Sequence, residues 1–152
     1  MKHKIDIKKV AEGLGLPVEC TEAFFDDGRI IGRLGEFIRA FDRNSVRSSS
    51  ENTSYDVIDP INGKEEVRAI TPGGISFAAS KEVGSGRKVT QDGFIKKLES
   101  IDIVVGVDYR NLSELVFHEI TKEQVYEMET QGLLTKSKKV CVSKLHKFLG
   151  II

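Results

Sequence analysis

The sequence predicts an α/β fold in which helices flank a mixed central sheet. Residues 29–42, RIIGRLGEFIRAFD, form the clearest amphipathic helix, and residues 54–71 are typical of a hairpin. The segment IDIVVGVDY, at 101–109, is β-branched and apolar on both faces, which is typical of a buried central strand. The order helix, hairpin, helix, strand, strand, helices places helices on both faces of the sheet.

The first half of the chain contains two predicted helices and a polar loop. Residues 5–14 form a short helix that ends at the glycines 13 and 15. Helix 29–42 carries one apolar stripe, composed of Ile30, Leu34, Phe37, Ile38 and Phe41. Residues 44–54, NSVRSSSENTS, are predicted to be a surface loop.

The remaining elements begin with the hairpin, which has strands at 54–59 and 64–71 and a turn at PING. Pro72-Gly73-Gly74 ends it, and residues 84–88, GSGRK, form a flexible loop. Further helices are expected at 91–100, 122–131 and 142–149, and further strands at 101–109 and 115–120.

Bulk properties indicate one globular domain spanning residues 1–152, with 39% hydrophobic and 30% charged residues. With 23 basic and 23 acidic residues, the chain is not a polycation that would bind nucleic acid non-specifically. Acidic and basic side chains can still cluster at separate places in the folded protein. No apolar run could span a bilayer and the first residues lack a signal peptide's apolar core. Cys20 and Cys141 lack metal-ligand spacing and suggest reduced thiols, so we expect a cytoplasmic protein with no membrane association.

The register of the hairpin decides which of its charges meet. A two-residue turn at Asn62-Gly63 pairs Asp59 with Glu66 and leaves Asp56 on the other face. A three-residue turn with Gly63 left-handed pairs Asp56 with Arg68 and makes Glu66 its diagonal neighbour. In the second register two carboxylates converge, and such oxygen ligands select Mg²⁺ or Mn²⁺.

Asp56 and the segment Glu66-Val67-Arg68 resemble the PD-(D/E)XK nuclease superfamily, which includes most type II restriction endonucleases. That family places an acid on one strand and, after a hairpin, an acid, any residue and usually a lysine. The helix segment GRLGE at 32–36, the loop at 84–88 and the two downstream strands also resemble the family's core, over residues 29–120. The resemblance implies a restriction-endonuclease-like fold and a Mg²⁺-dependent endonuclease that hydrolyses double-stranded DNA.

By this resemblance Asp56 and Glu66 are metal ligands, and Glu36 and Arg68 support catalysis. Arg68 stands at the lysine position, where it keeps the charge but cannot act by proton transfer, so Lys64 or Lys81 is a candidate substitute. Tyr55 replaces the family's proline. Glu36 is otherwise a solvated glutamate beside arginines of its helix.

The residues Ser80, Lys81, Arg87 and Lys88 flank the glycine-rich loop and are candidates for DNA contacts, or else belong to an ordinary surface loop. His118 alternates with Val116 and Ile120 as a core residue would, and His146 has no ligand-spaced neighbour in sequence. A homodimer would suit cleavage of both strands of a palindrome. The alternatives are a non-catalytic nucleic-acid-binding or interaction domain, which Arg68 favours, and a structure-specific nuclease such as a junction resolvase.

Overall fold

The computed structural model describes residues 1–49, 54–83 and 86–151, and it confirms the predicted α/β class. A mixed sheet of six strands runs in the order β1-β7-β6-β4-β3-β2. Its strands β4 and β6 are parallel, whereas the other neighbours pair antiparallel. The six strands are β1 (Lys2–Lys4), β2 (Val46–Arg47), β3 (Val57–Asp59), β4 (Gly63–Ile70), β6 (Ile103–Asp108) and β7 (Glu114–Thr121).

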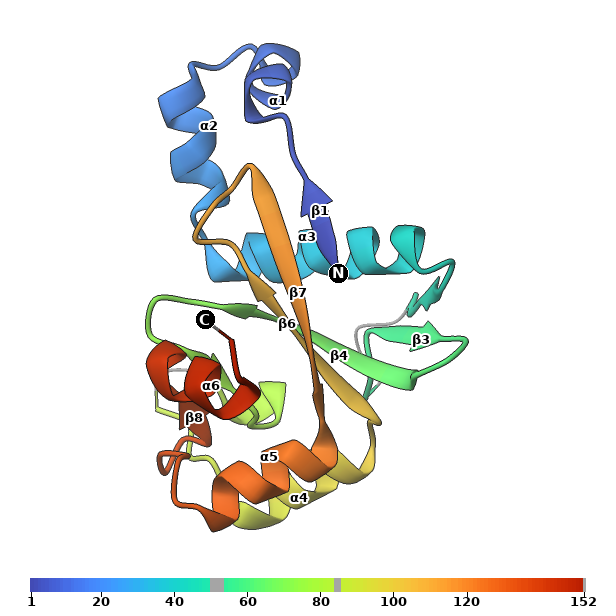
Figure 1. The fold of residues 1–152 in the computed structure, drawn as a ribbon, viewed down its shortest axis with the longest axis vertical. Helices are drawn as coiled ribbons and strands as arrows, with labels where there is room; N and C mark the ends of the chain where they lie inside the picture. The colour runs from blue at the N-terminus through green and yellow to red at the C-terminus, as the bar shows by residue number, and fades with distance from the viewer. Residues whose placement is uncertain (50–53, 84–85, 152) are drawn as a thin grey trace.

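Helices lie at both ends and on both faces of this sheet (Figure 1). They are α1 (Ile7–Leu14), α2 (Val18–Phe25), α3 (Gly28–Asp42), α4 (Gln91–Glu99), α5 (Lys122–Thr130) and α6 (Val142–Leu149). A second sheet pairs β5 (Ile75–Ser76) with β8 (Lys139–Val140), and η1 (Ser80–Glu82) is a 3-10 turn. Helix α2 and strand β1 were not expected, and β2 lies within the predicted loop 44–54. Residues 50–53 of that loop and 84–85 of loop 84–88 lie outside the described residues.

Two hydrophobic cores form, one on each face of the sheet, as the expected helix coverage requires. On one face α4, α5, α6 and the small sheet pack on the strands, and on the other face α3 crosses them. Gly35 allows α3 to approach closely, because a Cβ there would lie 2.8 Å from Val107 Cγ2 and 3.2 Å from Val67 Cγ1. None of the helices among the described residues is long and apolar enough to cross a membrane.

The buried face of α3 differs from the predicted stripe. Phe37 and Phe41 are 53% and 85% exposed, whereas Ile31, Gly35 and Arg39 are buried. Close approach at Gly35 turns this face toward the sheet. Arg39 is accommodated there because its guanidinium pairs with Glu65 at 2.7 Å and with Glu119 at 2.6 Å. The Arg47 guanidinium carbon instead lies over the exposed Phe37 ring, 4.2 Å from the ring centre.

Neither predicted register of the hairpin is correct in detail. Asp59 pairs with Gly63, so the loop is Pro60-Ile61-Asn62 and the pairing has moved two residues from the three-residue alternative. Gly63 has a φ of +81°, the left-handed conformation expected of it. The Asp59 carboxylate sets this turn by accepting from the backbone N–H groups of Ile61 and Asn62. A two-residue shift keeps the faces unchanged, so Asp56 and Glu66 still share a side.

Candidate active site

The predicted site residues meet where β3 separates from β4. Pairing between these strands extends to Val57 and Glu65, and the Asp56 N–H donates to the Glu65 carbonyl at 2.9 Å. The Asp56 carboxylate then accepts the Val67 N–H at 2.8 Å. Asp56 is therefore fixed directly on the open edge of β4, at the level of Glu66.

Glu66 is 5% exposed and lies between two cations. Its Oε1 accepts from Nε and Nη2 of Arg68 at 3.1 and 3.0 Å, while its Oε2 accepts from Lys97 Nζ at 2.6 Å. Arg68 is itself oriented by donating to the Ser76 carbonyl at 2.7 Å and to Ser80 Oγ at 3.1 Å. The second acid of the motif is thus held rigidly by groups from three segments of the chain.

Glu36 joins this group from α3. Its Oε2 lies 3.0 Å from Arg47 Nε and 3.7 Å from Arg33 Nη1, and only 14% of its side chain is exposed. Glu36, Asp56, Glu66 and Arg68 line one pocket of about 480 Å³. The structure therefore brings together all four residues predicted as catalytic, and it turns Glu36 inward, not toward solvent.

The three carboxylates repel one another in this partly buried setting. Burial and the neighbouring Glu66 charge raise the pKa of Asp56 to about 7, with a smaller contribution from Glu36. Burial also raises the pKa of Glu36, and Glu66 adds to that shift against the opposing arginines. The Val67 N–H and the Lys97 charge oppose this shift but do not cancel it, so a cation bound beside Asp56 would be favoured.

Basic side chains surround the carboxylates. The pocket that holds Glu36 is also lined by Arg29, Arg33 and Lys139. A second pocket of about 470 Å³ shares Asp56, Glu66 and Ser80 with the first and adds Lys81, Lys96 and Lys97. This arrangement of acids encircled by bases suits a phosphate diester, whose charge the bases can neutralise.

The four residues predicted to contact DNA separate into two pairs. Ser80 and Lys81 line the second pocket, beside the carboxylates. Arg87 folds back onto its own loop, where Nη1 donates to the Lys81 and Val83 carbonyls at 3.2 and 3.5 Å. Lys88 is exposed. Only the first pair is placed at the site.

The cation missed by sequence reasoning is Lys97 of α4. Of the substitutes predicted for the absent lysine, Lys64 places its Nζ 5.6 Å from the Tyr55 ring centre and Lys81 lies at the pocket wall, whereas Lys97 contacts Glu66 directly. Lys97 comes three residues after the buried Phe94 and one before the buried Leu98. This position at the border of the apolar face was visible in the sequence, and it indicates a lysine held against the protein.

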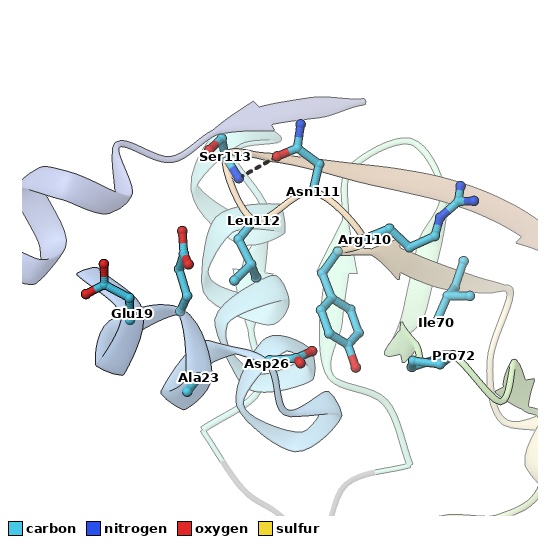
Figure 2. A pocket seen from close by; sticks show the side chains of 11 residues that line it. Glu19, Ala23, Asp26, Ile70, Pro72, Arg110, Asn111, Leu112 and Ser113 are labelled. Carbon is cyan, nitrogen blue, oxygen red and sulfur yellow. Dashed lines mark hydrogen bonds between the residues drawn. The ribbon is translucent and has the colours of Figure 1, made fainter. Parts of the chain in front are cut away.

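A further pocket, of about 660 Å³, is separate from this site (Figure 2). It is lined by Glu19, Glu22 and Asp26, with Tyr109 and the segment 110–113 opposite. Figure 2 shows Arg110 directed away from Glu19 and Asp26. Glu19, Glu22 and Asp26 face a single basic lining residue, Arg110, and this balance of charge disfavours a phosphate ligand.

Comparison of the chain with protein-family models, with curated proteins and with solved structures gave no match.

Proposed function

We propose that this chain is a Mg²⁺-dependent deoxyribonuclease that hydrolyses phosphodiester bonds in the manner of a small type II restriction endonuclease. The observation that carries the proposal is the convergence of Asp56, Glu66 and Glu36 with Lys97 and Arg68 at the open edge of β4. Acids that bind a divalent cation and bases that face the substrate are the two components that metal-assisted phosphodiester hydrolysis requires.

The donor set fits a Mg²⁺ or Mn²⁺ ion. Carboxylate oxygens are the ligands that these hard ions prefer, and the burial and neighbouring acids that raise the pKa of Asp56 would favour a cation beside it. Asp56 and Glu66 would hold the ion, with Glu36 as a supporting acid. When bound, the ion would polarise the phosphodiester and activate a water molecule.

Arg68 and Lys97, the two cations bonded to Glu66, would serve different chemical roles. The Arg68 guanidinium, whose N–H groups already bond Glu66, Ser76 and Ser80, would stabilise charge that develops on the phosphate oxygens by electrostatic attraction. Lys97 presents a primary amine, which can exchange a proton as a guanidinium cannot. Lys97 therefore supplies the function for which the motif position itself, occupied by arginine, is unsuited.

The basic residues around the pockets favour a nucleic-acid strand as the substrate. Arg29, Arg33 and Lys139 line the first pocket, and Lys81 and Lys96 line the second, which shares Asp56 and Glu66 with it. A strand bound across the two pockets would place its phosphates beside these cations. Two such subunits in a homodimer would cut both strands of a duplex, and a junction resolvase would use the same residues on branched DNA.

One observation favours a non-catalytic binding domain as the second candidate. Both oxygens of Glu66 already accept from cations, which reduces the gain from adding a metal ion there. In that case the pocket binds DNA through its bases, and Asp56 serves only the fold.

Incubation of plasmid and of four-way junction DNA with the purified chain in Mg²⁺ or Mn²⁺ separates these functions. Discrete plasmid fragments support the restriction-like enzyme, and cleavage confined to junctions supports a resolvase. DNA that is bound but never cut refutes the enzymatic function.

Matched variants identify the residues responsible. Cleavage should be lost in Asp56→Asn and Glu66→Gln, and it should persist in Asp92→Asn, which removes an exposed acid paired with Lys96 at 3.1 Å on the surface of α4. Equal losses in all three would indicate a general folding defect, and undiminished cleavage in all three would indicate a contaminating nuclease. Either result would contradict the assignment.

A further inference from the structure

A second group of ionisable side chains lies on the opposite face of the sheet from α3. Asp108 is the last residue of β6, His118 lies in β7 and His146 lies in α6. Gly106 pairs with His118 and Asp108 with Val116, so Asp108 and His118 are diagonal neighbours on one face, and α6 packs against that face. Because these residues are far apart in sequence, no spacing motif predicted that they would lie together.

The three side chains point toward a common position. Their ligand atoms all lie within 4.8 Å of one another. His146 Nε2 is 3.9 Å from Asp108 Oδ2, and the two imidazole centres are 6.2 Å apart. Ligand atoms that share a tetrahedral zinc ion lie about 3.3 Å apart, so binding requires an inward movement of only about 1 Å.

A buried nitrogen atom without a hydrogen bond lies at the same position. His146 Nε2 is buried and has no hydrogen-bond partner among the described residues. Burying such a nitrogen without a partner is unfavourable, and a metal ion would satisfy it.

The Asp108 carboxylate is shared with Arg110. Nε of Arg110 lies 3.0 Å from both carboxylate oxygens, and its Nη2 also donates to Oδ2. The Arg110 side chain is 63% exposed, so it can turn into solvent when a cation replaces it. Arg110 is therefore a competitor for the site and not an obstacle built into the core.

We propose that Asp108, His118 and His146 form a binding site for one divalent transition-metal ion of the Zn²⁺ class, which fastens α6 to strands β6 and β7. Two imidazoles and one carboxylate select Zn²⁺, Co²⁺ or Ni²⁺ over Mg²⁺, which prefers oxygen ligands. Three protein ligands leave a fourth position for water or another small ligand. The site shares no residue with the carboxylates at the edge of β4, and its occupancy does not depend on nuclease activity.

The test is a metal titration of the full chain, freed of metal with a chelator, in a Cys20→Ser/Cys141→Ser background. Both cysteines are exposed and would otherwise compete as ligands. Calorimetry with Zn²⁺ should give one ion per chain, and Co²⁺ should give the visible absorption bands of a low-symmetry site. Saturation with Zn²⁺ should raise the Tm by about 5–10 °C at 100 times the Kd.

Variants locate the ion. His146→Ala should weaken Zn²⁺ binding at least tenfold, whereas His3→Ala, which removes an imidazole bonded to Asp42 at 2.8 Å, should leave it unchanged. Arg110→Gln should strengthen binding, because it removes the competing cation. Unchanged affinity in His146→Ala, or the absence of Co²⁺ bands in a chain with the parent's circular dichroism, would overturn the proposal.

Discussion

The substitution Asp56→Asn should make the metal-free protein more stable at neutral pH. Burial and Glu66 raise the Asp56 pKa from 3.8 to about 7 in the folded state. Between these values the folded chain retains a proton that the unfolded chain has released, so the free energy of unfolding decreases as the pH rises from about 4 to about 7. At about 1.4 kcal/mol per tenfold change in proton affinity, this decrease amounts to at most about 4 kcal/mol.

Asparagine cannot ionise, and its Oδ1 can still accept the Val67 N–H that Asp56 accepts. The stability difference between Asp56→Asn and the parent should therefore be small at pH 4 and should grow to about 2–4 kcal/mol by pH 8. Urea denaturation in a chelator, followed by circular dichroism at several pH values, measures it. A difference that stays constant with pH, or that favours the parent at pH 8, would refute the reasoning.

Asp59→Asn is the matched control, with the opposite sign. Hydrogen bonds from Arg43 hold the pKa of Asp59 well below its usual range, so its contribution is present above pH 4 and is lost as the pH falls below that value. The Asp59→Asn variant should lose about 2–3 kcal/mol at pH 7, because charged hydrogen bonds are replaced by neutral ones.

Three further predictions concern the metal, the missing lysine and the packing of α3. Mn²⁺ affinity measured by calorimetry should fall about tenfold per pH unit below pH 7, since a proton on Asp56 competes with the ion; a flat profile would exclude Asp56 as a ligand. Lys97→Gln should slow single-turnover cleavage about 100-fold. Lys2→Gln, which removes a lysine from an exposed surface ion pair, should leave the rate unchanged. Equal cleavage rates in the two variants would exclude a role for Lys97 in the mechanism. Gly35→Ala should cost about 1–3 kcal/mol in thermal unfolding because its Cβ would meet Val107, unlike Gly13→Ala, whose Cβ meets nothing within 4 Å.

Periodic patterns in the sequence were sufficient to predict most of the regular structure. The predicted helix 142–149 coincides with α6, and the buried strand at 101–109 contains β6. The buried face of α3 was predicted wrongly, because the contact at Gly35 and the burial of Arg39 on Glu65 depend on residues far along the chain. Apolar periodicity alone could not predict that an ion pair would hold Arg39 in the core while Phe37 and Phe41 remained exposed.

The sequence predicted that Glu36, Asp56, Glu66 and Arg68 would lie together, but it did not predict the geometry of the group. Side chains alternate between the two faces of a strand, so a register shift of two residues leaves Asp56 and Glu66 on the same face. The two residues therefore lie together although the predicted pairing of the strands was incorrect. The actual loop depends on the Asp59 carboxylate bonding to Arg43 and to the turn N–H groups, a long-range arrangement. Lys97 reaches Glu66 only through the packing of α4, and His118 meets His146 only through the packing of α6.

The most direct test of the nuclease assignment is single-turnover cleavage of plasmid DNA in Mg²⁺ by the parent and by Glu66→Gln. Glu66→Gln retains a side chain of the same size but removes the charge that would hold the metal and the two cations. Cleavage by the parent that stops in a chelator and falls at least 100-fold in Glu66→Gln is the predicted result. Cleavage that proceeds equally in both proteins, or no cleavage by the parent in either Mg²⁺ or Mn²⁺, would contradict it.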